Sequence, residues 1–308
     1  MSWREYGTRM TLTAPGSSSI TINDPPYTQN GWLCEELVIQ SGLQTSIANR
    51  PMQHGSYIDA AYREGMSVSM TLLNYAGDAT TRRNQADTFM QLAGNMLADR
   101  ASGYAANDYI GGVLDLGVGT AHQRSIRALR LVQPPAWSSV GGALKSVQLV
   151  LQTELPYAES SVTNLDTASL TDTGGGFTIP LTIPVTFTAG GAGQVTVTNN
   201  GNVEAFPLVQ VYGPCTGFAL SNLSNTPELE VRSLSFPNAS IASGDYWTID
   251  LFRRTVVYQD AGPSMISAMD LASSKWFGFL PTDDVLQMTA SGYTASTKAR
   301  VLMRDAWI

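Results

Sequence analysis

SKWFGFLPTDDVLQM at residues 274–288 and KARVLMRDAW at residues 298–307 carry the clearest secondary-structure signal in the chain. Their aromatic and β-branched content predicts three strands, the first of them at 274–280. Side chains alternate between the two faces of a strand. In the last strand one face would be apolar and the other basic, with Val301, Met303 and Trp307 opposed to Lys298, Arg300 and Arg304. This alternation is typical of an antiparallel sheet packed on one side.

Short strands are also expected before this closing region. Roughly eight short strands with turn signals, and no helix from residue 177 onward, predict a β-sandwich. NNGN at residues 199–202 predicts a hairpin turn, because Asn and Gly tolerate the positive φ angles of such turns. The earlier strands are expected at 185–187, 194–198, 205–212, 229–236, 247–252 and 255–258.

The first half is also mainly β, with one helix. Met66–Leu72 alternates strictly, which predicts a strand that could be exposed for pairing with a neighbour. Helical spacing of apolar residues predicts a helix over 81–100. Its apolar stripe would consist of Ala86, Phe89, Met90, Ala93, Met96 and Leu97. The stripe either packs only on the domain's own sheet, which is favoured, or also meets a neighbouring subunit.

The chain of 308 residues has room for two domains, each with its own core. Residues 158–176 are rich in Ser, Thr, Asp and Gly, which predicts a linker. The predicted fold class is therefore mainly β, with a one-helix β domain at 1–157 and a β-sandwich at 177–308.

Charge is scarce and unevenly spread. Charged residues make up 14% of the chain, against roughly 25% in an average soluble domain. This deficit indicates that much of the surface faces other protein. No Lys or Arg occurs between Lys145 and Arg232, and the seven acids in that interval account for the net charge of −7. Nothing resembles a basic track for nucleic acid. Without a signal sequence or a long apolar run, we expect a soluble protein made in a reducing cytoplasm.

The sequence offers no catalytic, cofactor or metal site. His54 and His122 stand outside any known catalytic motif, and the Gly174–Gly176 run is not followed by a helix that would cradle phosphate. The adjacent Asp283 and Asp284 are expected to serve a turn. Two lone cysteines, Cys34 and Cys215, are expected to be buried. The tryptophans Trp247, Trp276 and Trp307 either lie in the core, as their apolar neighbours favour, or form a sugar-stacking platform.

Motifs in both halves resemble one family. In the second half these are NNGN at 199–202, Pro207, Tyr212-Gly213, Asn222, Gly244-Asp245, Ile249-Asp250, Arg253-Arg254, residues 274–281 and Ala306-Trp307. In the first half they are Arg50-Pro51, Gly55, Gly65, residues 66–72, 81–100 and 127–132, and Leu155-Pro156-Tyr157. Together they resemble the distal tail proteins of siphophages. The usual Pro-Gly-x-Asn turn of that family is here Pro-Thr-Asp-Asp at 281–284.

The resemblance implies a structural, non-enzymatic virion protein at the distal end of a phage tail. Its ring-forming (belt) domain would form a homohexamer that joins the tail tube protein to the tail-tip hub, with tape measure or receptor-binding proteins as further candidate partners. Its second domain would be a galectin-like sandwich. No cofactor, specific nucleic acid or membrane is implied. The alternatives are a carbohydrate-binding tail adhesin that acts through the sandwich, and a hydrolase with an unrecognised site.

Overall fold

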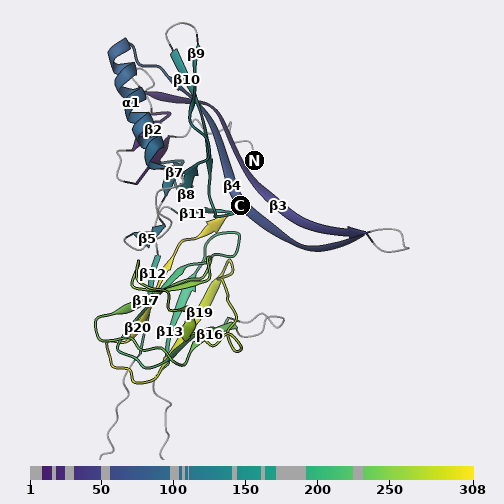
Figure 1. Cartoon of the computed structure of the whole chain (residues 1–308), viewed down its shortest axis with the longest axis vertical. Helices are drawn as coiled ribbons and strands as arrows, with labels where there is room; N and C mark the ends of the chain where they lie inside the picture. Colours follow the sequence, from purple (N-terminus) through teal and green to yellow (C-terminus); the bar gives the residue numbers. More distant parts are fainter. Residues whose placement is uncertain are drawn as a thin grey trace, which may run out of the picture. The chain divides into compact units, whose positions relative to one another are not determined.

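The computed structural model describes every residue except 1–8, 16–18, 25–30, 50–55, 98–103, 106–107, 110, 141–143, 161–163, 171–191 and 225–231. The chain divides into two compact units (Figure 1). Unit 1 comprises Met1–Gly103, Tyr109–Ser161 and Ile308, and unit 2 comprises Tyr104–Asp108 and Val162–Trp307. Both units are built mainly from strands, as the sequence predicts.

Unit 1 is built on one large sheet, in which the strands follow the order β11-β8-β7-β1-β2-β3-β4-β10-β9. Neighbours are antiparallel except β2 and β3, and β8 also pairs with β10, so the sheet closes on itself. The strands are β1 Met10–Thr13, β2 Ile20–Ile22, β3 Trp32–Asn49, β4 Ser56–Asn74, β7 Gly112–Leu116, β8 Arg124–Leu131, β9 Ala136–Val140, β10 Leu144–Gln152 and β11 Ala158–Glu159.

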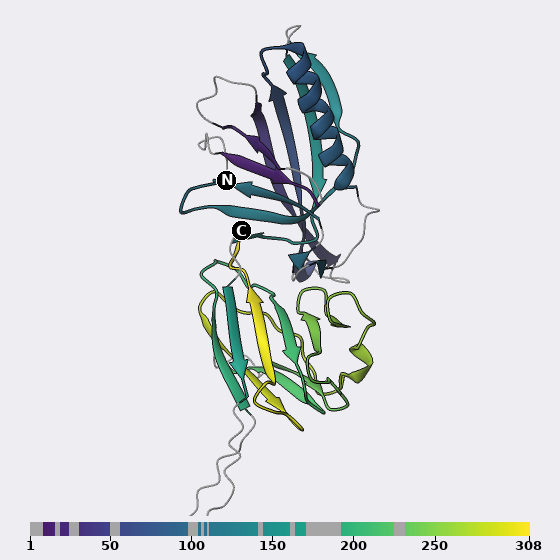
Figure 2. The same ribbon diagram turned by 90° about the vertical axis from the view of Figure 1, so that its left-hand side faces the viewer.

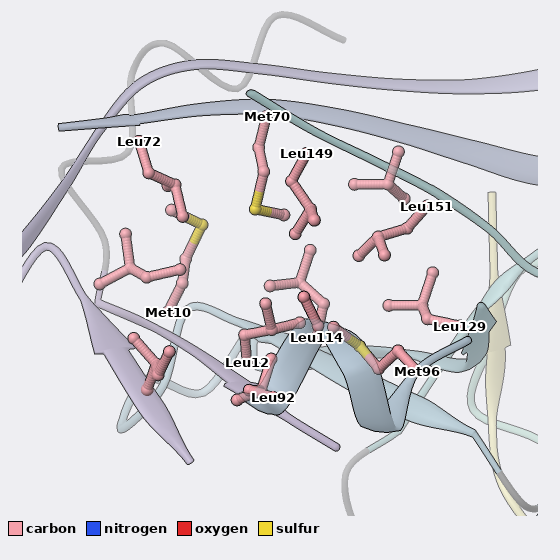
Figure 3. Close-up of a cluster of buried hydrophobic side chains, with 14 of the residues drawn as sticks. Met10, Leu12, Met70, Leu72, Leu92, Met96, Leu114, Leu129, Leu149 and Leu151 are labelled. Carbon is pink, nitrogen blue, oxygen red and sulfur yellow. The ribbon is translucent and has the colours of Figure 1, made fainter. Parts of the chain in front are cut away.

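The core of unit 1 lies between this sheet and the helix α1, Ala79–Asn95. The alternation predicted for Met66–Leu72 is confirmed, since Met66, Val68, Met70 and Leu72 are all buried. Figure 3 shows Met70 and Leu72 facing the same interior as Leu12, Leu114, Leu149 and Leu151. This strand segment is not exposed for pairing, however, because β3 and β10 flank it on both sides.

Helix α1 lies along one face of the sheet (Figure 2), but its limits differ from the predicted 81–100. It begins at Ala79 because Asp78 caps it, accepting a hydrogen bond of 2.8 Å from the Thr81 amide. It ends at Asn95, because the next residues turn to meet β8: the Leu131 amide donates to the Met96 carbonyl at 2.7 Å. Residues 98–100 lie outside the described part of the chain.

The buried face of α1 is also rotated from the predicted stripe. Phe89, Ala93 and Met96 are buried as expected, and Leu92, which the stripe omitted, joins them. Met90 and Leu97 were wrongly included, since they are 44% and 43% exposed. The buried residues 89, 92 and 96 still follow helical spacing, so the predicted period is correct. The predicted stripe, however, lies on a face rotated about the helix axis from the one that is buried.

One part of unit 1 extends beyond its core. Strands β3 and β4 pair from Trp32↔Asn74 to Asn49↔Ser56, whereas β10 covers only Ser67–Asn74 of β4. Residues 43–49 and 56–63 therefore form a two-stranded arm, which Figure 1 shows projecting from the sheet. The expected turn at 50–55 lies outside the described residues.

Unit 2 is a sandwich of two sheets, ordered β12-β20-β14-β17-β18 and β13-β19-β15-β16. The strands are β12 Asn164–Ser169, β13 Ala192–Thr198, β14 Leu208–Tyr212, β15 Phe218–Asn222, β16 Arg232–Phe236, β17 Tyr246–Asp250, β18 Thr255–Tyr258, β19 Asp283–Ala290 and β20 Lys298–Met303. Trp247 of one sheet meets Phe218 and Phe236 of the other, with ring centroids 5.9 and 6.3 Å apart. This contact shows that the two sheets share a core.

The smaller elements are a 3-10 turn, η2 at Ile266–Ala268, and three short strands, β5 Tyr104–Ala105, β6 Asp108–Tyr109 and β21 Ala306–Trp307. The basic and apolar faces predicted for the closing strand are present in β20, where Val301 and Met303 are buried and Lys298 and Arg300 are partly exposed. That strand is divided, because Arg304 and Asp305 separate β20 from β21.

Three local predictions for the second half are wrong. Residues 164–169 of the expected linker form β12, which pairs with β20. Residues 274–280 form no strand; their β pairing is one isolated bridge between Phe279 and Ala205, and the Lys275 amide donates to the Ser233 carbonyl at 2.8 Å. NNGN is not a hairpin turn, because β13 and β14 belong to different sheets. Instead, Gly201 approaches Ala306 so closely that an added Cβ would lie 1.9 Å from the Ala306 carbonyl oxygen. The strand expected at 185–187 lies outside the described residues.

Candidate functional site

The candidate catalytic and metal-binding residues do not lie together in the structure. His122 is exposed, and His54 lies outside the described residues. Among the described residues, no three His, Cys, Asp or Glu side chains gather as a metal site. The expected turn role fits Asp284, which is buried and accepts from the Leu280 amide at 2.9 Å. Asp283 instead begins β19 and accepts across the sheet from the Thr198 hydroxyl of β13 at 2.6 Å.

Of the two cysteines and the three candidate tryptophans, one of each kind is buried and the others are partly exposed. Cys215 is buried as predicted, but Cys34 is only partly buried. Burial still raises the pKa of the Cys34 thiol to about 11, against a smaller opposing effect of its hydrogen bond to the Glu36 carbonyl. Trp247 lies in the core, whereas Trp276 and Trp307 are partly exposed. The prediction that all three tryptophans are core residues is therefore wrong for two of them.

The most organised polar arrangement lies on the outer face of the five-stranded sheet. Strands β20, β14 and β17 are adjacent there, and their inward side chains include Val301, Val211 and Trp247. The outward side chains are polar because they alternate with these buried residues. The register aligns them in two rows across the sheet, Ser169–Lys298–Tyr212–Tyr246 and Thr167–Arg300–Gln210–Thr248.

Hydrogen bonds link these rows into a continuous relay. Arg300 Nη1 donates to the Tyr212 hydroxyl at 3.5 Å, and that hydroxyl donates to Gln210 Oε1 at 3.0 Å. Gln210 Nε2 donates in turn to Asp260 Oδ1 at 3.4 Å. Asp260 also accepts from Thr248 at 3.1 Å and from the Tyr246 hydroxyl at 2.9 Å. Gln210 and Thr248 are almost fully buried, so this part of the relay is covered, while Tyr212 and Arg300 are partly exposed.

The electrostatics of this face are set by the aromatic and charged neighbours. The Tyr212 and Tyr246 rings lie 5.0 Å apart, and the Lys298 ammonium lies 5.4 Å from the Tyr212 ring centroid. Burial, followed by the hydrogen bond and negative charge of Asp260, raises the pKa of Tyr246 to about 12. Tyr246 therefore remains a neutral donor at physiological pH. Lys298 and Arg300 place two cations on this face.

A second candidate surface lies in unit 1, where α1 meets the edge strand β9. Trp137 of β9 packs edge-on against Phe89, with centroids 5.8 Å apart, and its indole N–H donates to the Met90 sulfur at 3.3 Å. Trp137 is partly exposed and Met90 is 44% exposed. Strand β9 ends the sheet order, so this apolar surface borders strand edges that are open to pairing.

No described helix is both long and apolar enough to cross a membrane.

The chain matches the crystal structure of SPP1 Dit (gp 19.1), described as a paradigm of the hub adsorption apparatus in phages that infect Gram-positive bacteria. The TM-score is 0.54 at 12% identity, and the match covers 97% of this chain and 99% of that chain. At this identity the match establishes the fold alone.

Two structures of the phage p2 baseplate in its activated conformation, with Sr or with Ca, are more distant. Their TM-scores are 0.48 and 0.47 at 10% identity, with 97% of this chain and 99% of each of those chains covered. No protein-family model matches the sequence, and no curated protein matches it.

Proposed function

We propose that this chain is a structural virion protein that forms a hexameric ring at the distal end of a phage tail. The ring joins the tail tube protein to the tail-tip hub and supports host-recognition proteins. The observation that carries this proposal is the match to SPP1 Dit over nearly the full length of both chains. A likeness confined to the sandwich would say little, because one β-sandwich fold serves many functions.

The arm of unit 1 supports a ring independently of that likeness. A ring needs heterologous contacts, in which one patch meets a different patch on the next subunit. Within the described part of the chain, residues 43–49 of β3 and 56–63 of β4 pair only with each other. An isolated two-stranded hairpin is at best marginally stable in water, and its unpaired edges are templates for another chain. A neighbouring subunit would supply the surface that this arm lacks.

The Met90–Trp137 surface provides a second contact of the kind that a ring requires. Aromatic residues and Met are enriched at the centres of protein interfaces, where charged residues are scarce. The low charged fraction of the chain, 14%, agrees with a protein whose surface is largely covered by other protein. A non-enzymatic role in the virion follows from the same proposal.

Light scattering and negative-stain electron microscopy of the purified chain test the ring. We expect six-fold rings or stacks of rings at high protein concentration. In an arm-excised variant, residues 43–62 would be replaced by Asn-Gly, which favours a tight hairpin turn. This variant should remain folded, because β10 pairs with β4 only from Ser67 onward and the excised segment lies beyond that pairing, but it should lose the rings.

Arg300→Gln is the matched control, because its substitution lies in unit 2 and should leave the rings intact. Rings of unchanged symmetry in the arm-excised variant would show that the arm does not hold them. A chain that stays monomeric at every concentration, with or without a tail tube protein, would contradict the ring itself.

A further inference from the structure

The outer face of the five-stranded sheet in unit 2 carries a grid of polar side chains. The proposed ring contacts lie in unit 1 and do not involve this grid. The grid spans three adjacent strands, with Ser169, Lys298 and Tyr212 in one row and Thr167, Arg300 and Gln210 in the other. Neighbouring strands lie about 4.8 Å apart, and alternate residues on one strand lie about 6.8 Å apart. The grid is therefore about 10 Å by 7 Å, which is large enough to hold one monosaccharide unit.

The centre of the grid is cationic. Lys298 and Arg300 stand on the same face of β20, two residues apart, so one anionic group can lie between them. Arg300 uses Nη1 to donate to Tyr212 and, as a guanidinium, has further N–H donors in a fixed planar array. Planar donors of this kind match the geometry of phosphate and carboxylate groups.

The flanks of the grid are hydroxyl and amide groups. Thr167 and Ser169 lie directly across from Arg300 and Lys298 on β12, and both are exposed. On the other flank, Gln210 holds the Tyr212 hydroxyl at 3.0 Å and is itself held by Asp260. The relay fixes Tyr212, and through it Arg300, before any ligand arrives. A site whose polar groups are held in place loses less entropy on binding.

The simplest structural role for these residues is to stabilise the sheet by cross-strand pairs. Lys298 over Tyr212 and Tyr212 beside Tyr246 are such pairs. That role does not account for a buried Gln210 and Thr248 on the same face. Apolar side chains would cover the sheet there without the desolvation cost of an amide and a hydroxyl.

We propose that this grid binds an anionic saccharide unit, a sugar or polyol that carries a phosphate or carboxylate group. The anionic group lies between Arg300 and Lys298, and the ligand hydroxyls bond to Thr167, Ser169 and the Tyr212 hydroxyl. An acidic peptide would satisfy the cations but would leave the row of hydroxyl groups on β12 without partners. The saccharide therefore fits the whole grid, whereas a peptide fits only its centre.

Isothermal titration calorimetry on the full chain at low salt tests this assignment. The probes are glucose 6-phosphate, glucuronate and glycerol 1-phosphate, compared with glucose, inorganic phosphate and a glutamate-rich peptide. We expect at least one anionic polyol to bind, with an affinity that falls as salt rises. Glucose should bind at least tenfold more weakly than the best anionic probe, and so should inorganic phosphate.

Variants separate binding from stability. Arg300→Gln and Lys298→Gln should each weaken binding at least tenfold, and Tyr212→Phe should weaken it severalfold because Arg300 loses its hydrogen-bond partner. Arg254→Gln, at an exposed arginine outside the grid, is the matched control and should bind like the parent. Thermal melts identify any variant that fails to fold; if Arg300→Gln fails, Lys298→Gln carries the test.

The assignment is overturned if none of the three anionic polyols binds, or if Lys298→Gln and Arg300→Gln leave the affinity unchanged. If inorganic phosphate binds as tightly as the anionic polyols, the grid is an ion-binding site that does not recognise the sugar. If glucose binds as tightly as the best anionic probe, Lys298 and Arg300 do not contribute to binding through their charge. Binding of the glutamate-rich peptide in preference to every polyol would replace the saccharide with a protein partner.

Discussion

Replacing Trp247 by Ala should be among the most destabilising single changes in the sandwich. Trp247 is 1% exposed and contacts Phe218 and Phe236 of the opposite sheet. Burial of a Trp removes roughly 150–250 Å² from water, which corresponds to about 4–6 kcal/mol at about 25 cal/mol per Å². Truncation also leaves a cavity that the two phenylalanines cannot fill completely.

One feature of Trp247 lowers this cost. Its indole N–H is buried and has no hydrogen-bond partner among the described residues, which destabilises the folded state by about 1–3 kcal/mol. Truncation removes that penalty together with the ring. The net loss for Trp247→Ala should therefore be about 3–5 kcal/mol, in the usual range for a buried Trp. Trp247→Phe removes the unpaired N–H but keeps most of the packing, so we expect a loss below about 2 kcal/mol.

Scanning calorimetry of the full chain measures these differences. For a unit of roughly 150 residues, 1 kcal/mol shifts Tm by about 2–4 °C, so Trp247→Ala should lower the Tm of unit 2 by about 6–20 °C. Trp276→Ala is the matched control, because Trp276 is only partly buried and should lose less than half as much. Equal losses at the two positions, or a Trp247→Phe variant as unstable as Trp247→Ala, would refute the reasoning.

Three further changes test the packing of unit 2. Asp250 is buried, its Oδ2 has no hydrogen-bond partner among the described residues, and burial raises its pKa, so its charge costs stability at neutral pH. At pH 7 the free energy of unfolding of Asp250→Asn, measured with urea, should equal or exceed that of the parent. This difference should vanish below about pH 4, the pKa of Asp in the unfolded chain, because Asp is then protonated in both states. Gly201→Ala should destabilise unit 2 by roughly 1–3 kcal/mol in the same assay, because its Cβ would meet the Ala306 carbonyl; a parent-like melt would contradict that contact. A fragment 162–308 should melt well above a fragment 177–308, because only the longer one keeps β12 and the buried Ala168 and Leu170; equal melts would show that β12 adds nothing.

The sequence predicts features that depend on local periodicity. Met66, Val68, Met70 and Leu72 form the predicted buried face because alternation is a property of the strand itself. In β20, Val301 and Met303 are buried as predicted, but Leu302 between them is buried too. Residues 274–280 were predicted to form a strand because of their composition. Phe277, Gly278 and Phe279 are all buried, so the segment does not alternate between two faces. An added Cβ at Gly278 would lie 2.7 Å from the Glu204 side chain, so packing overrides propensity there.

Pairing between strands that are far apart in the chain could not be predicted from the sequence. Asn164–Ser169 has the polar composition of a linker, yet it pairs along its whole length with Lys298–Met303, more than a hundred residues away. The grid was missed for the same reason. Tyr212, Gln210 and Arg300 are ordinary outward residues on their own strands, and only the register of β20 between β12 and β14 brings them together.

The two proposals can fail separately because they rest on different units. The arm belongs to unit 1, and the grid lies on the outer face of one sheet of unit 2. If both proposals hold, the arm-excised variant loses its rings but keeps the parent affinity for an anionic polyol. Arg300→Gln then shows the reverse, with rings intact and binding lost. Loss of both properties in either variant would mean that the grid is completed only in the ring, so that binding and assembly are one function rather than two.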